Sequence, residues 1–117
     1  MAAPNLLALT TVHADTAILP ATNTETDLLA AIATNHVANI EAIYCANVHA
    51  TVVGWITVIH KKGGTDYTIA YQTRIPVKTT INVLLGKPLY LAEGDSLRVI
   101  ANQSSNVTCF APWTDMS

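Results

Sequence analysis

Charged residues are scarce in this sequence. Only 12% of its 117 residues are Asp, Glu, Lys or Arg, and the formal net charge is −2. A nucleic-acid-binding protein normally concentrates Lys and Arg on one face to displace counterions from phosphates, so this class of partner is not expected. Disorder is not expected either, because half of the residues are hydrophobic and their burial offsets the entropy cost of ordering the chain.

Cysteines and aromatic residues are also few. Cys45 and Cys109 are the only cysteines, and both lie in apolar stretches. Reduced, buried thiols are the expected state, although one bridge can form if the two strands face each other. The aromatic residues, 6% of the chain, are not interleaved with arginines, so no platform for base stacking is predicted.

Motifs for catalysis and for metal binding are missing. The histidines lack paired ligand spacing, and positions in turns or at the solvent edge are favoured for all four of them: His13, His36, His49 and His60. No Gly-x-Ser-x-Gly sequence occurs, and Glu93-Gly94-Asp95 favours a tight turn over a calcium site. We therefore expect no enzymatic activity, no catalytic residues, no metal and no cofactor.

One segment, Ala42–His60, has no charged residue and approaches the roughly 20 residues that cross a bilayer. Polar residues interrupt it, and its Val and Ile residues favour two buried strands joined by a turn. No basic residue precedes the short apolar run Leu6–Leu9, as it would in a secretory signal. The sequence therefore predicts no membrane partner.

Turn-forming residues divide the chain at intervals of about 8 to 12 residues, which is typical of an antiparallel β-sandwich or jelly roll of about seven to nine strands. Gly63-Gly64 is the strongest hairpin signal, and Pro112 is expected to limit the last strand. The predicted strands are residues 17–22, 39–46, 51–60, 65–71, 79–85, 89–91, 97–101 and 107–111.

Domain organisation follows from the first quarter of the chain, which is rich in Thr and Ala and has no sustained periodicity. We expect an extended N-terminal arm over residues 1–16 and a single β-sandwich domain over residues 17–117. Residues 27–34 fit one helical turn as well as a strand.

Several predicted strands are apolar on both faces, although the outer face of a sandwich should be polar. Trp55, Ile59, Ile100 and Phe110 cannot all be internal if their sequence neighbours are. The surplus predicts a subunit interface, or else a sheet covered by the arm of the same chain. Candidate interface residues are Leu6, Leu7, Leu9, Trp55, Ile59, Phe110 and Trp113, the last read as an exposed anchor.

The chain from about Leu19 onward resembles a family of small β-sandwich virion structural proteins of tailed bacteriophages. The resemblance rests on Ile43–Val48, on the Ile75-Pro76-Val77 corner, and above all on the Leu-Tyr-Leu-x-Glu-Gly-Asp-Ser-Leu core of Lys87–Val99. Two departures concern the Asp-Gly that often follows Asn-Val in that family, replaced here by His49-Ala50, and the altered tail 110–117.

The resemblance implies a non-enzymatic capsid decoration (cement) protein in the virion, assembled in the host bacterial cytoplasm. Its implied partners are the major capsid protein or other virion proteins, together with further copies of itself, often as a trimer. A tail, neck or fibre component of the same virion is the alternative within this class. A carbohydrate-binding module is the alternative outside it. It requires aromatic side chains on one exposed face, and the candidates are Tyr67, Tyr71, Tyr90 and Trp55.

Overall fold

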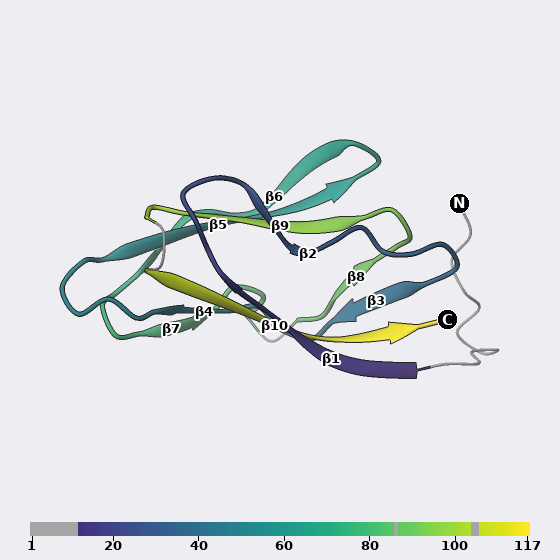
Figure 1. Cartoon of the computed structure of the whole chain (residues 1–117), viewed down its shortest axis with the longest axis horizontal. Coiled ribbons are helices and arrows are strands. Elements are labelled where there is room, and N and C mark those ends of the chain that lie inside the picture. Colours follow the sequence, from purple (N-terminus) through teal and green to yellow (C-terminus); the bar gives the residue numbers. More distant parts are fainter. Residues whose placement is uncertain (1–11, 86, 104–105) are drawn as a thin grey trace.

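The computed structural model describes residues 12–85, 87–103 and 106–117. They form ten β-strands and no helix (Figure 1), which confirms the all-β prediction. In this part of the chain, no helix is long and apolar enough to span a membrane. The strands are β1 (Val12–Pro20), β2 (Thr26–Leu29), β3 (Val37–Ile40), β4 (Tyr44–Asn47), β5 (Gly54–Lys62), β6 (Thr65–Ile75), β7 (Thr80–Asn82), β8 (Leu89–Leu91), β9 (Ser96–Ala101) and β10 (Val107–Met116).

The strands form two antiparallel sheets packed face to face (Figure 1). In sheet A, β10 pairs with β1 on one side and with both β3 and β4 on the other, and β8 and β7 continue outward from β3 and β4. Sheet B has the order β2-β9-β5-β6. If β3 and β4 count as one interrupted strand, and β7 and β8 as another, the orders become 1-8-3-6 and 2-7-4-5. This is the connectivity of a jelly roll.

The interruption of sheet A explains why Pro112 does not end the last strand. The prediction that it does is wrong, because β10 runs through it to Met116. The Pro112 carbonyl accepts a hydrogen bond from the Glu41 amide, 2.9 Å between N and O, so the missing proline N–H points to the same side. On that side residues 41–43, which connect β3 and β4, leave the ladder with β10. The proline therefore costs no hydrogen bond of the ladder.

The hairpin between β5 and β6 forms where the sequence predicts it. Gly63 and Gly64 have φ values of 58° and 79°, a left-handed region that glycine enters without a steric penalty. Residues 27–34, in contrast, contain no helical turn: β2 ends at Leu29 and an irregular loop follows.

The predicted edge strand is longer than expected. Residues 12–16, which the sequence places in the arm, pair with β10 in the same ladder as the rest of β1, from Val12 opposite Met116 to Pro20 opposite Thr108. The first eleven residues, including Leu6, Leu7 and Leu9, lie outside the described residues. The division into an arm and a domain therefore stays a prediction.

The hydrophobic core lies between the two sheets and is formed by the side chains on the inward-facing side of the strands. Ile56, Val58 and Val99 belong to it, and all three are fully buried. Their neighbours Trp55, Ile59, Ile100 and Phe110 lie outside this cluster and face outward, since side chains alternate along a strand. Part of the apolar surplus read from the sequence therefore lies on the outer faces of the sandwich.

Candidate interaction surfaces

A row of apolar side chains crosses the outer face of sheet A. The register places Ile18 directly opposite Phe110, and Phe110 directly opposite Tyr44, so three adjacent strands each contribute one member. Ile18 is 60% exposed and Tyr44 is 42% exposed, with the half-buried Phe110 between them. We call these three residues the outer row. Because β1 is the edge strand of sheet A, a partner can reach the outer row across its free side.

The outer face of sheet B is less accessible. It carries Trp55, Ile59 and Ile100, yet Ile59 is only 7% exposed. Beside them Arg98 binds two carboxylates at the start of the adjacent strand β2. Glu25 Oε2 lies 3.1 Å from Nη1, and Asp27 Oδ1 lies 2.8 Å from Nε. This paired, partly polar face is typical of a solvated sheet surface.

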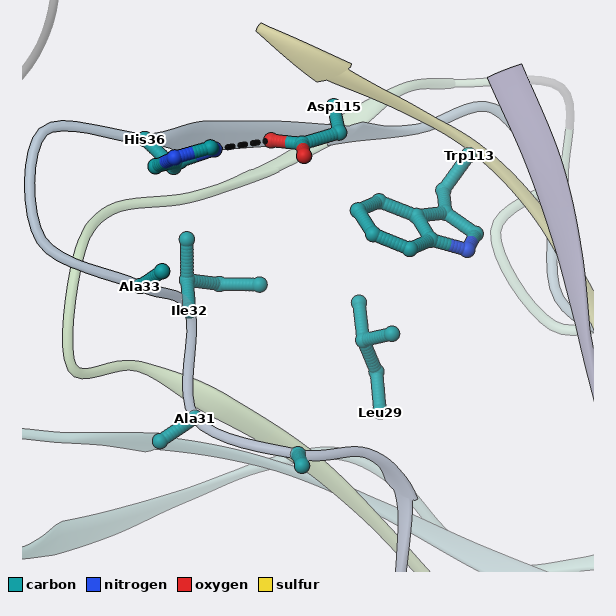
Figure 2. A pocket seen from close by; sticks show the side chains of 8 residues that line it. Leu29, Ala31, Ile32, Ala33, His36, Trp113 and Asp115 are labelled. Atoms are coloured by element: carbon teal, nitrogen blue, oxygen red, sulfur yellow. Dashed lines mark hydrogen bonds and ion pairs between the residues drawn. The ribbon is translucent and has the colours of Figure 1, made fainter. Parts of the chain in front are cut away.

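A pocket of about 280 Å³ opens between the two sheets at the end of β10, and we call it the mouth pocket. Figure 2 shows Leu29 and Ile32 on one side and Trp113 on the other, with the His36–Asp115 pair above them. The walls are mostly apolar, and the remaining lining residues are Ala30, Ala31 and Ala33. His36 Nδ1 lies 2.8 Å from Asp115 Oδ1 and ties the β2–β3 loop to β10.

The motif that carries the family resemblance supports one wall of this pocket from behind, through hydrogen bonds to the loop that contains Ile32. Glu93-Gly94-Asp95 forms the tight turn expected between β8 and β9, with Gly94 at φ 81°. The Gly94 amide donates to the Ile32 carbonyl at 2.8 Å, and the Ile32 amide donates to the Asp95 carbonyl at 2.9 Å. The Asn35 amide donates to Glu93 Oε2 at 2.7 Å. The turn therefore holds the loop that contains Ile32 in place.

The buried carboxylate of Asp95 fastens the same turn to β5. Its Oδ2 accepts hydrogen bonds from the Ala92 amide at 3.1 Å, His60 Nε2 at 3.1 Å and Lys62 Nζ at 3.2 Å. Burial by itself raises the pKa of Asp95, but the bonds from His60, Ala92 and Lys62 outweigh it, and the pKa lies below its ordinary value. His60 was expected to mark a strand end entering water; it is largely buried and serves this carboxylate instead.

A second pocket, of about 410 Å³, lies between β6 and the segment that runs from β7 to Leu85. Its lining includes Ile69, Ile81 and Val83, and the 83% exposed Leu85 stands at its side. None of the candidate residues from the sequence lies in it.

The described residues hold no group of three or more His, Cys, Asp or Glu side chains that could bind a metal ion. Cys45 and Cys109 are cross-strand partners and both are fully buried, with 3.7 Å between their sulfur atoms. Their mutual hydrogen bond and their burial raise the pKa of the Cys45 thiol, so a nucleophilic thiolate is disfavoured there. Both cysteines are free thiols, as expected.

The candidate interface residues do not form one surface. Phe110 lies on the outer face of sheet A, Trp55 and Ile59 lie on that of sheet B, and Trp113 lines the mouth pocket. Trp113 was expected to be exposed, but it is half-buried and packs against the core. Ile18 and Tyr44 were missed, because only the cross-strand register places them beside Phe110.

The aromatic residues suggested for a carbohydrate site are also divided. Tyr90 lies on β8 in sheet A, whereas Tyr67, Tyr71 and Trp55 belong to β5 and β6 in sheet B. The single exposed aromatic face that this reading requires is therefore not formed by these four residues.

No protein family and no curated protein matches the chain by sequence. Among solved structures, a chain of the T13 IBDV viral particle matches with a TM-score of 0.54 at 10% identity, over 91% of this chain and 30% of that one. This likeness shows a shared fold. A Bacillus endospore appendage protein, from disulfide-linked pili, matches with a TM-score of 0.48 at 14% identity, over 91% of this chain and 87% of that one. A pentameric capsid protein from metagenomic phage sequences matches with a TM-score of 0.41 at 13% identity, over 84% and 59%.

Proposed function

We propose that this chain is a non-enzymatic structural protein of a bacteriophage virion and acts as a capsid decoration protein that bridges and stabilises major capsid subunits. The jelly-roll fold, shared with a chain of an icosahedral virus particle, supports a place in a protein shell. Fold alone does not define function, so the argument rests on the surfaces.

The outer row carries the proposal. Two exposed apolar side chains and a half-buried phenylalanine stand side by side on three strands of a regular sheet. A partner that covers them gains roughly 2.5 kcal/mol for each ~100 Å² of apolar surface buried, before the costs of association. The face is preformed by the ladder of β1, β10 and β4, so little order has to be gained on binding.

The mechanism is mechanical. Each copy lies across two neighbouring capsid subunits, and the surface that it buries opposes the internal pressure of packaged DNA. Further copies of the chain, as in a trimer, cover the remaining apolar surface through closed symmetry.

Binding to purified capsids that lack the protein tests this function. The wild-type protein is expected to bind in a copy number comparable to that of the major capsid protein and to raise the temperature at which the capsid releases DNA. Phe110→Ser is expected to weaken binding at least tenfold, whereas Tyr67→Ser, at a 57% exposed position on β6 of sheet B, leaves it unchanged. Circular dichroism establishes that both variants are folded.

The outcomes separate the alternatives. A few copies per particle, bound at one vertex or on the tail, replace the decoration role by a tail, neck or fibre role. Absence from every particle fraction overturns the virion proposal as a whole.

A further inference from the structure

The mouth pocket lies at the end of the molecule where β1 begins. Val12, the first residue of β1, pairs with Met116, and two residues just before Met116 on β10, Trp113 and Asp115, line the pocket. The eleven residues that precede β1 therefore leave the sandwich a few residues from the pocket. They span up to about 36 Å when extended, at about 3.3 Å per residue.

The chemistry of this segment matches the pocket. Residues 1–11 contain no charged side chain, and Leu6, Leu7 and Leu9 give them an apolar centre. The pocket offers Leu29, Ile32 and the indole of Trp113 as its walls. Exposing leucine side chains to water is unfavourable, so their burial against these apolar walls stabilises the contact.

The direction of β1 favours a pocket of another copy. The ladder with β10 is antiparallel, so β1, followed back to its first residue, points toward Met116 and away from Trp113. To enter the pocket of its own molecule, the segment must reverse within a few residues, and a four-residue turn takes up the stretch that holds Leu9. The pocket of a neighbouring molecule can be entered without this reversal.

We propose that residues 5–9 of one copy dock in the mouth pocket of a neighbouring copy. This inference rests on the proposed function, since it names the contact that joins copies of the chain. Each molecule donates a segment at one site and accepts a segment at another, so the exchange closes either reciprocally in a two-fold dimer or head-to-tail in a ring. It also gives Trp113 and the three leucines a common role as the two sides of one contact.

A disulfide trap tests the contact in the purified protein. Ala33 is exposed and lines the pocket, so the double variant Leu7→Cys/Ala33→Cys brings two thiols together if the segment docks. Oxidised glutathione accepts the two electrons of the thiol pair as the bond forms. Covalent dimers and larger multimers are expected on a non-reducing gel, and reduction returns them to monomer.

The matched control is Leu7→Cys/Ala50→Cys. Ala50 is also exposed, but it lies in the loop after β4, whose last residue, Asn47, pairs with Val107 at the opposite end of β10. This variant is expected to give at least tenfold less cross-linked product. A bond within one chain at position 33 overturns the exchange between copies, and equal cross-linking in both variants overturns the docking site.

Fluorescence provides a measurement that needs no engineered thiol. In a Trp55→Phe background Trp113 is the only tryptophan, and its emission is expected to shift to shorter wavelength as protein concentration rises. Deletion of residues 1–11 is expected to abolish this shift while circular dichroism stays unchanged. If the truncated protein keeps the shift, the docking proposal is wrong. If docking fails but the protein still binds capsids, the proposed function stands without it.

Discussion

Replacement of the buried Asp95 is expected to weaken the whole sandwich. Its side chain is 2% exposed, and it joins the β8–β9 turn to β5 through His60 and Lys62. Asp95→Asn keeps the shape and an acceptor for the Ala92 amide, but it removes the charge. Hydrogen bonds to a charged group contribute about 1.5–3 kcal/mol each. The Lys62 side chain is 57% exposed, so its share is at most ~1 kcal/mol.

We therefore expect Asp95→Asn to lower the free energy of unfolding at pH 7 by about 2–3 kcal/mol. For a domain of this size, this corresponds to a loss of roughly 10 °C in the midpoint of thermal unfolding. Urea titration followed by circular dichroism measures the first quantity, and a thermal scan measures the second. Asp66→Asn, at an exposed position on β6, is the matched control, with an expected change within ~0.5 kcal/mol.

The dependence on pH gives a second criterion for the same variant. The pKa of Asp95 is lowered in the folded protein, so its stabilising effect is complete above the unfolded pKa of about 3.9 and is lost as the pH falls through the lower folded value. The difference between wild type and Asp95→Asn is expected to shrink below about pH 4. A difference that stays constant down to pH 2, or an Asp95→Asn no weaker than Asp66→Asn, refutes this account.

Three further substitutions test the core, a buried amide and a turn by urea unfolding. Ile40→Ala is expected to cost about 2–5 kcal/mol, because Ile40 is fully buried and a cavity remains; a cost under 1 kcal/mol contradicts its place in the core. Asn47→Ala is expected to cost about 2–3 kcal/mol, since its side-chain amide donates to two carbonyls at 3.0 Å; Asn47→Asp, which lacks those donors, should be no better. Gly64→Ala is expected to cost only about 1–2 kcal/mol, from its φ of 79° alone, because no atom lies within 4 Å of an added Cβ; a larger loss indicates a contact that this geometry lacks.

Most strands could be located from the sequence because local chemistry marks their ends, although residues 39–46, expected as one strand, are divided between β3 and β4. Gly63-Gly64 and Glu93-Gly94-Asp95 set turns whose backbone angles depend on those residues and on few others. Alternation within single strands also predicted that residues such as Trp55 and Ile100 could not all be internal together with their neighbours, and both lie outside the core cluster.

Features that depend on long-range pairing could not be predicted in this way. Pro112 is compatible with the middle of β10 only because the chain around Glu41 leaves the ladder there. The contact between His60 and Asp95 needs β5 beside β9. The outer row and the mouth pocket depend on the register of β10 with its neighbouring strands. Without that register, the sequence around Trp113 suggested an exposed side chain that anchors a partner.

The ladder between β1 and β10 gives the molecule two very different responses to force. Its nine residue pairs run from Val12 opposite Met116 to Pro20 opposite Thr108. Tension applied between Val12 and Met116 acts on the pair at one end of the ladder. The hydrogen bonds then break one after another, at low force. Tension applied between Val12 and the far end of β10 slides the strands along each other, so all the hydrogen bonds must break together. A copy pulled in this second direction is stiff, which makes the orientation of its attachments as important as their strength.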